Sequence, residues 1–372
     1  MKYYIIAGEP SGDLHASNLM KALKQKDAHA EFRFWGGDLM LEQGGTLVKH
    51  YRDLAYMGFL EVVLHLKTIL GNMAFCKKDV VSWNPDVLIL VDYPGFNLRI
   101  AEYAHKKGIK TVYYISPKVW AWKKGRVKTI KKVVDKMLVI FPFEKSFYQK
   151  YGMQVEYVGN PLLDAIKDEE HLSKKSFCKQ FGLSQKPIIA LLPGSRKQEV
   201  SRILSVMLQV VPLFKEYQFV IAGVPSLGEE FYNKYLSDES VSVIFNETHQ
   251  IVHHADAALV TSGTATLETA LLGTPQVVCY AGGYVSYQIA LRVITVKYIS
   301  LVNLIMDKPV VTELIQNDLN VNGLSHELDL ILNNKNYRQQ QLDNYSRLRK
   351  VLGGNGASAK AAEAISKMLK QP

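Results

Sequence analysis

The stretch YYIIAGEPSGD, residues 3–13, joins a short apolar run to two acids, a proline and two glycines, and a helical pattern rich in Leu and Met follows at once. An apolar run before a helical pattern predicts a buried strand, a turn and a helix. In open α/β sheets, ligands bind at the carboxyl ends of the strands, where glycines let the backbone approach and helix N-termini offer unpaired N–H groups. This stretch therefore predicts an α/β fold with a binding site at the edge of its sheet. The glycines do not follow the GxGxxG spacing, so a dinucleotide site is not indicated.

The same strand-and-helix unit recurs along the chain. Apolar, β-branched runs alternate with helical stretches at 3–7, 87–91, 111–115, 136–141 and 155–158, and the series restarts at 188–192, 219–222, 241–245, 257–261 and 276–280. Such alternation predicts parallel sheets, and the restart predicts two Rossmann-like domains. Because a charge-rich stretch separates the two series, we expect domains at 1–165 and 166–352. The helical tail breaks at Gly353–Gly356, and we expect a final helix, 355–372, to complete the first domain.

Composition limits the class of protein and its partners. A chain of 372 residues, 48% hydrophobic and 22% charged, is long enough for two domains with cores of their own. The formal net charge of +10 favours an anionic partner, which could be nucleic acid, acidic lipid or a phosphorylated small molecule. The three cysteines, Cys76, Cys178 and Cys279, are far apart and indicate neither disulfides nor zinc, which fits a reducing cytosol. We expect neither a signal peptide nor a membrane-spanning helix.

Asp92 is the candidate general base, because it follows the apolar run 87–91 directly. Partial burial at a strand end would raise the pKa of its carboxyl and suit it to accept a proton from a hydroxyl. The alternative is that Asp92 caps the helix beginning near Asn97, although Asn97 is closer and sufficient for that. Ser11 or Asp13 could likewise only cap the helix behind the opening stretch.

Cations and indole rings follow a third strand. In ISPKVWAW, residues 115–122, Lys118 could meet an anionic substrate, while core packing of Trp120 and Trp122 is the alternative. The basic stretch from Lys123 to Lys132 could face solvent or anionic lipid.

The second series carries signals for a diphosphate. Arg196 ends the stretch LPGSR, and a guanidinium can clamp a diphosphate with two hydrogen bonds. Ser262-Gly263-Thr264 opens a helix after the run 257–261, and it could cradle an anion or only cap that helix. Glu268, one turn further, would repel phosphate but could accept both hydroxyls of a ribose. A nucleoside diphosphate group meets both requirements.

Other polar residues indicate less. Asn303 stands in the apolar segment 298–304, and we expect Glu313 and Gln316 on one face of a helix, at the surface or as caps. His253 and His254 end a predicted helix and point to different faces, which argues against a metal site. No Ser-His-Asp order, HExxH or Walker pattern is present.

In order along the chain, these motifs resemble the lipid-A-disaccharide synthase family, bacterial glycosyltransferases of GT-B architecture. The matching stretches are Gly8–Asp13, Asp92–Asn97, Ser116–Trp122, Phe141–Glu144, Leu192–Arg196, Ser262–Glu268 and Tyr298–Leu304. The chain departs from the family pattern at Pro10, Gly95 and Val302, where an Ala, a second acid and a Pro are common. Without an acid at position 95, Asp92 would serve alone.

The resemblance implies two Rossmann-like domains whose parallel sheets face a central cleft. It also implies an inverting transfer from UDP-2,3-diacylglucosamine to the 6-hydroxyl of 2,3-diacylglucosamine 1-phosphate, with Asp92 as base and without a metal or other cofactor. On the acceptor side we expect Glu9, Ser11, Gly12, Asp13, Asn97, Lys118 and Trp120. On the UDP side we expect Arg196, Ser262, Gly263, Thr264, Glu268, Tyr280, Asn303 and Glu313.

Both implied substrates carry acyl chains. The stretch YMGFLEVVL, residues 56–64, could bind them, enter the bilayer edge or form a core helix. With the basic stretch nearby, it predicts a cytoplasmic protein attached to the inner face of the bacterial inner membrane. The alternatives are another UDP-sugar GT-B enzyme, such as a polyprenyl-linked transferase or a UDP-N-acetylglucosamine 2-epimerase, and a basic module that binds anions or nucleic acid. We expect no nucleic acid partner, because aromatic residues do not recur among the basic ones.

Overall fold

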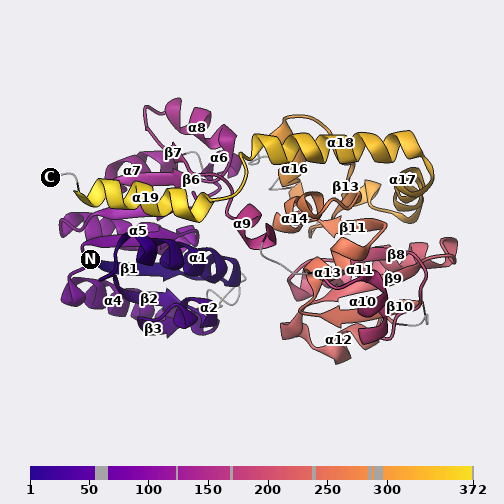
Figure 1. Cartoon of the computed structure of the whole chain (residues 1–372), viewed down its shortest axis with the longest axis horizontal. Helices are drawn as coiled ribbons and strands as arrows, with labels where there is room; N and C mark the ends of the chain where they lie inside the picture. The colour runs from indigo at the N-terminus through magenta and orange to yellow at the C-terminus, as the bar shows by residue number, and fades with distance from the viewer. Residues whose placement is uncertain are drawn as a thin grey trace. The chain divides into compact units, whose positions relative to one another are not determined.

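The chain forms two compact units, one of residues 1–165 with 352–372 and one of residues 166–351, in a computed structural model. The structure describes residues 1–54, 66–122, 125–167, 171–236, 240–283, 287–288 and 296–370. Each unit contains one parallel sheet with helices on both faces (Figure 1). The predicted fold class, two Rossmann-like α/β domains, is confirmed. The apolar stretch 56–64 and the cations Lys123 and Lys124, singled out from the sequence, lie outside the described residues.

The first unit is built on a seven-stranded sheet in the order β3-β2-β1-β4-β5-β6-β7. Its strands are β1 (Lys2–Ala7), β2 (Glu31–Gly36), β3 (Thr46–His50), β4 (Val87–Val91), β5 (Thr111–Tyr114), β6 (Lys136–Val139) and β7 (Glu156–Tyr157). All five residues of β4 are buried, because helices cover both faces of the sheet.

Helices of the first unit bury alternate side chains of each strand. On one face, Tyr4, Ile6 and Leu90 pack with α4 (Leu66–Trp83), α5 (Pro94–Lys106) and α7 (Arg126–Val133). On the other face lie α1 (Pro10–Lys26) and the final helix α19 (Ala357–Lys370), which contact one another (Figure 1). Shorter helices of this unit are α2 (Asp38–Glu42), η1 (Tyr51–Leu54), α6 (Val119–Trp122) and α8 (Pro142–Gln149), and α9 (Leu162–Lys167) leads out of it.

The second unit has a six-stranded sheet in the order β10-β9-β8-β11-β12-β13. Its strands are β8 (Ile188–Leu192), β9 (Gln218–Gly223), β10 (Val241–Phe245), β11 (Ala257–Thr261), β12 (Gln276–Tyr280) and β13 (Glu313–Ile315). Glu313 thus lies on a strand and Gln316 begins the 3₁₀ turn η4 (Gln316–Asp318), so the prediction that both share a helix face is wrong.

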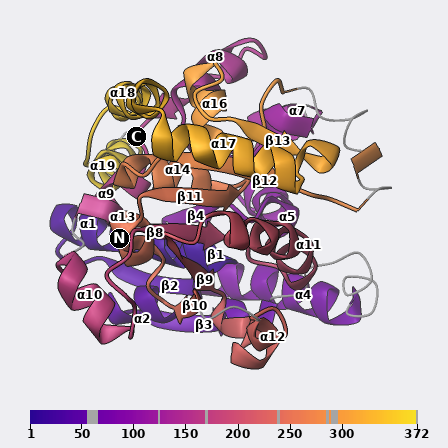
Figure 2. The same ribbon diagram turned by 90° about the vertical axis from the view of Figure 1, so that its right-hand side faces the viewer.

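Two helical layers cover the second sheet. One face packs against α11 (Lys197–Met207) and α17 (Val321–Asn333), which lie in front of the strands in Figure 2. The other face packs against α10 (Lys174–Gln180), α13 (Thr248–His254) and α14 (Thr264–Leu272). The remaining helices are η2 (Leu208–Leu213), η3 (Pro225–Leu227), α12 (Glu229–Asn233), α16 (Leu301–Met306) and α18 (Lys335–Val351).

The two strand orders place polar loops beside one another. In each sheet the chain leaves its first strand toward one edge and then returns to the other side of that strand, which opens a crevice at the carboxyl ends. Ala7 of β1 pairs with Val91 of β4, so the opening stretch and Asp92 leave neighbouring strands at the same level. Leu192 of β8 pairs with Val260 of β11 in the same way.

Candidate functional site

The carboxylate of Asp92 projects from a turn whose backbone is held in an unusual conformation. Asp92 and Tyr93 both have left-handed φ angles, 45° and 47°, which disfavour residues with a Cβ atom. The carbonyl oxygen of Asp92 accepts hydrogen bonds from Asn97 Nδ2 at 2.8 Å and from the Tyr113 hydroxyl at 2.5 Å. These bonds hold the main chain of the turn and do not involve the carboxylate of Asp92.

The pKa of Asp92 depends on two other residues predicted for the site, Glu9 and Lys118. Burial raises the pKa of this carboxyl to about 6, the positive charge of Lys118 lowers it and the negative charge of Glu9 raises it. Glu9 and Lys118 come from the loops after β1 and β5, the strands on either side of β4. A carboxylate with this pKa is mostly ionised at neutral pH and is a stronger base than an exposed one.

Gly8 is required by the ring that packs over it. A Cβ atom added at Gly8 would lie 2.4 Å from Cδ1 of Tyr93. No real Cβ contact is that short, so a larger residue would displace the ring next to Asp92. The first glycine of the opening stretch therefore lets β1 and the Asp92 turn approach each other.

Asp13 has a different role from the two predicted for it. Its carboxylate is 2% exposed and accepts backbone N–H bonds from Gly37 at 2.7 Å, Leu39 at 3.1 Å and Met40 at 3.2 Å. Asp13 thus caps α2, not its own helix, and it is not a substrate contact in this conformation. This side chain explains the second acid of the opening stretch.

The other residues of that stretch divide between packing and exposure. Gly12 packs against Ala7, where an added Cβ would lie 3.3 Å from the Cβ atom of Ala7. Ser11 is exposed on the first turn of α1, and the side chain of Glu9 makes no capping hydrogen bond. Two of the acceptor-side residues predicted in this stretch, Glu9 and Ser11, are therefore accessible to a ligand.

Asn97 ties two strands together and does not start a helix. It is fully buried in α5, which begins at Pro94. Its Nδ2 group lies 3.4 Å from the carbonyl oxygen of Ile6 and 3.3 Å from that of Val91, besides its bond to Asp92. The prediction that Asn97 meets the acceptor is replaced by a supporting role beneath the Asp92 turn.

Trp120 is buried, as in the core-packing alternative. Its indole Nε1 donates to Oε1 of Glu144 at 3.2 Å, and Glu144 Oε2 accepts from the backbone of Ile140 at 3.1 Å and of Phe141 at 2.9 Å. Trp120 therefore has no free polar group for a substrate, whereas Lys118 in the same loop is exposed. No role was predicted for Glu144, although an acid within the aromatic stretch Phe141–Glu144 was a visible signal.

The loop of the second unit that ends in Arg196 bends at a glycine. Gly194 has φ 122°, and a Cβ atom there would lie 2.3 Å from Oε2 of Glu199, which also accepts from the Ser195 N–H at 3.1 Å. Arg196 follows as the exposed residue directly before α11. The loop that carries Arg196 leaves the carboxyl end of β8, the strand next to β11.

The loop after β11 presents a helix N-terminus. No side chain caps α14, since Gly263 precedes it and the Ser262 hydroxyl donates to the carbonyl oxygen of Ile299 at 2.8 Å. Thr264 is the exposed first residue of the helix. The side chains of this motif therefore do not cap α14, and the alternative that they serve only as caps is wrong. The backbone N–H groups of the first turn can bind an anion.

Glu268 lies one turn into α14 and has a partner on α13. Its Oε2 lies 3.6 Å from His249 Nε2, and the two side chains are 24% and 21% exposed. His249 also lines a cavity of about 400 Å³ at the carboxyl ends of β9 and β10, with Gly223, Pro225 and 246–250. Tyr280 is the partly exposed last residue of β12. Glu268 and His249 thus bring hydrogen-bonding groups from two neighbouring helices together.

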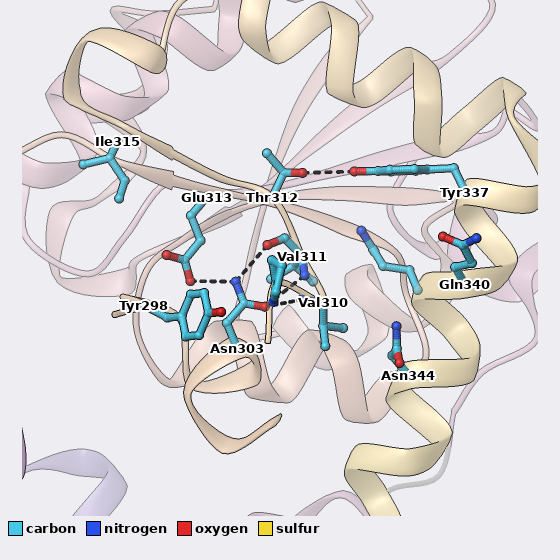
Figure 3. Close-up of a pocket in the computed structure, with 12 residues that line it drawn as sticks. Tyr298, Asn303, Val310, Val311, Thr312, Glu313, Ile315, Tyr337, Gln340 and Asn344 are labelled. Atoms are coloured by element: carbon cyan, nitrogen blue, oxygen red, sulfur yellow. Dashed lines mark hydrogen bonds between the residues drawn. The ribbon is translucent and has the colours of Figure 1, made fainter. Parts of the chain in front are cut away.

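Asn303 and Glu313 satisfy each other inside the second unit (Figure 3). Asn303 Nδ2 donates to Glu313 Oε1 at 2.9 Å and to the Val311 carbonyl at 2.8 Å, while Asn303 Oδ1 accepts from the backbone N–H groups of Val310 and Val311. Asn303 is 1% exposed, so it has no hydrogen-bonding capacity left for UDP. For Asn303 the prediction of a direct contact with UDP is corrected: with Glu313 it holds α16 to β13, beside a cavity of about 400 Å³ that the partly exposed Glu313 also lines.

Metal ligands are not gathered anywhere in the described part of the chain: no group of three or more His, Cys, Asp or Glu side chains there could hold a metal ion. His253 instead stacks on His171, with ring centroids 4.0 Å apart.

Solved structures with this fold have low sequence identity to the chain. UDP-GlcNAc 2-epimerase from Methanocaldococcus jannaschii, in complex with UDP-GlcNAc and UDP, is similar with a TM-score of 0.68 and 16% identity, covering 99% of this chain and 100% of that one. CalG4, the calicheamicin glycosyltransferase, is similar with a TM-score of 0.60 and 14% identity, covering 100% and 98%. These likenesses show the fold alone: the chain shares the two-domain GT-B fold of these proteins.

Sequence relatives identify the family within that class. The family described as lipid-A-disaccharide synthetase matches residues 3–368. Lipid-A-disaccharide synthase from Syntrophus aciditrophicus is 40% identical, covering 99% of this chain and 97% of the relative, and that from Coxiella burnetii (strain CbuG_Q212) is 38% identical, covering 98% of both. The chain belongs to the lipid-A-disaccharide synthetase family. It is a glycosyltransferase of lipid A disaccharide synthesis, as the resemblance of its motifs predicted.

Proposed function

We propose that the chain transfers the sugar of UDP-2,3-diacylglucosamine to the 6-hydroxyl of 2,3-diacylglucosamine 1-phosphate, giving a β-1,6-linked disaccharide 1-phosphate and UDP. Membership of the family supports this reaction. The first unit would bind the acceptor, because it carries the candidate base, and the second would bind the UDP-sugar. Family membership alone leaves the choice of base open, and the environment of Asp92 supports this residue.

The observation that carries the assignment is the carboxylate of Asp92 at the crevice between β1 and β4, with its pKa raised to about 6 by burial. In the proposed step, this carboxylate takes the proton of the acceptor hydroxyl as the oxygen attacks the anomeric carbon. The bond from that carbon to the diphosphate breaks on the opposite face and leaves its electron pair on UDP. The configuration at the anomeric carbon is therefore inverted.

Groups of the second unit would bind the donor. The Arg196 guanidinium and the uncapped N-terminus of α14 at Thr264 supply positive charge for the departing diphosphate. Glu268 would accept hydrogen bonds from the ribose hydroxyls, and the cavity lined by His249 would offer room for the uracil ring of UDP. Because these groups can balance the charge of UDP, we propose turnover without a divalent metal.

We also propose that the protein works in the cytoplasm at the inner face of the bacterial inner membrane, where acylated substrates collect. The described residues contain no helix long and apolar enough to cross a membrane. Leu70 and Phe75 on α4 are 51% and 47% exposed, and Lys67 and Lys78 are exposed on the same helix. Apolar and basic side chains together favour binding at an anionic surface.

The test compares turnover and UDP binding in Asp92→Asn. Turnover of the two diacyl substrates should fall by roughly 10² to 10⁴ while the Kd for UDP stays within about twofold of the parent value. Mass spectrometry of the product would verify the disaccharide 1-phosphate. If Asp92→Asn keeps its turnover, Asp92 is not the base. Thermal stabilisation by UDP that disappears with EDTA would contradict the metal-free donor site.

A further inference from the structure

A second buried carboxylate lies close to the Asp92 site and takes no part in the proposed chemistry. Glu144 in α8 is 1% exposed, yet both of its oxygens accept N–H bonds, one from Trp120 and two from the backbone at Ile140 and Phe141. Burial raises its pKa to about 7, and the N–H donors oppose that rise. An ionised carboxylate is costly to bury, so a group of this kind in a core needs an explanation.

Glu144 holds one end of the loop that carries Lys118. This loop runs from β5 to α6, and Ile115 at its start has a left-handed φ of 65°. Ser116 Oγ lies 2.6 Å from the Tyr148 hydroxyl, and Trp120 Nε1 donates to Glu144, so α8 anchors the loop on both sides of Lys118. Lys118 itself is exposed, and its charge lowers the pKa of Asp92.

We propose that Glu144 is a positioning residue of the transferase reaction: through Trp120 it fixes the loop that presents the ammonium group of Lys118 to the carboxylate of Asp92. Only a carboxylate can serve here, because it accepts three N–H bonds on two oxygens. A glutamine amide would turn an N–H₂ group toward either the indole or the backbone donors. The inference rests on the proposed role of Asp92 as base.

The electrostatic neighbours of both acids are defined. The carboxylate of Asp92 is affected by the charges of Lys118 and Glu9 and by the backbone N–H of Tyr93, and its own charge acts on the Tyr113 hydroxyl. Glu144 faces Trp120, Ser116, Tyr148 and Tyr157, none of which carries a charge near neutral pH. Loss of the hydrogen bond between Glu144 and Trp120 would therefore change the pKa of Asp92 only by moving Lys118.

The experiment measures kcat/KM from about pH 5.5 to about pH 8.5 for Glu144→Gln, Lys118→Met and the double variant. When Lys118 no longer lowers the pKa of Asp92, more of the base is protonated in acid. We expect the loss in kcat/KM of each single variant to be about three- to tenfold larger at about pH 5.5 than at about pH 8.5, and the double variant to show no larger ratio than Lys118→Met. Glu102→Gln, an exposed glutamate of α5, is the matched control.

Trp120→Phe gives a second route to the same answer, because it removes the indole donor and keeps Glu144 and most of the ring. It should lower kcat/KM at low pH in the same way as Glu144→Gln. If Glu144→Gln does not fold, Trp120→Phe serves as the test of the positioning role. Equal losses at every pH, or losses that add to those of Lys118→Met, would overturn the positioning role. Full activity in Asp92→Asn would instead contradict the proposed base, and the positioning role of Glu144 that rests on it would be overturned as well.

Discussion

The side chains of Asn303 and Glu313 lie ten positions apart in the sequence and join α16 to β13 through a 2.9 Å hydrogen bond. Glu313 Oε1 also accepts from the backbone N–H and the hydroxyl of Ser300, at 2.9 and 2.7 Å, so the pair organises the whole segment that starts at Ser300. These bonds lie in a buried environment, where an unsatisfied partner is costly.

Asn303→Ala should therefore lower stability before it affects chemistry. The change removes one donor to Glu313 and the side-chain acceptor of the Val310 and Val311 N–H groups, and we expect a loss of about 2 to 4 kcal/mol in the second unit. Urea unfolding with limited proteolysis of that unit would measure it. Asn317→Ala, an exposed position of η4, is the control. Unchanged stability together with a weakened Kd for UDP would restore Asn303 to the nucleotide site.

Gly8→Ala should reduce turnover through the ring of Tyr93. The added methyl group would meet Cδ1 of Tyr93 at 2.4 Å and push the turn that carries Asp92. We expect kcat to fall about tenfold or more, with UDP binding unchanged. Gly95→Ala is the matched control in the same turn, because no atom lies within 4 Å of a Cβ atom there. The double variant Gly8→Ala, Tyr93→Ala should recover part of the loss, and an absence of recovery would show that the methyl group acts elsewhere.

The acid side of the pH profile should report Asp92. Its pKa of about 6 in the folded protein means that the free enzyme loses its base as the pH falls through 6, so kcat/KM should decline about tenfold per pH unit below that value. The same raised pKa affects stability: the folded protein holds the proton more tightly than the unfolded chain, so this group's contribution is present below pH 4 and is lost as the pH rises through about 6. A profile that stays flat down to about pH 5 would contradict the assignment.

The stacked histidines of the second unit should make it sensitive to acid. Burial lowers the pKa of His253, and the neighbouring His171 lowers it further. The folded unit therefore binds this proton less readily than the unfolded chain, whose histidine pKa is about 6.5. Stability is present above that pH and is lost as the pH falls below it.

His253→Gln should reduce that acid sensitivity. The difference in Tm between about pH 7.5 and about pH 5.5 should be smaller than in the parent protein, since the titrating ring is gone. His326→Gln, an exposed histidine of α17, should leave the difference unchanged. An equal reduction in both variants would show that the stacked pair is not the sensitive group.

Central strands were predictable because a strand that is buried on both faces requires a continuous run of apolar residues. Three other strands were missed, and each lies toward or at a sheet edge: β2 contains Glu31 and Arg33, β3 contains Lys49 and His50, and β13 has three residues. Edge positions tolerate polar side chains, so the local pattern does not distinguish such strands from loops.

Sequence by itself determined the fold class, the family and the loops at which a site could form, since apolar runs, glycines and strand-end acids depend on local chain geometry. Tertiary structure alone decided which of those acids remain available. The carboxylate of Asp13 accepts N–H bonds at the N-terminus of α2, that of Glu313 accepts from Asn303 and that of Glu144 accepts from Trp120, while Asp92 is the acid that we propose as the base. The physical reason is that hydrogen-bond donors around a carboxylate determine whether it is available to a ligand, and those donors come from segments far away in the sequence.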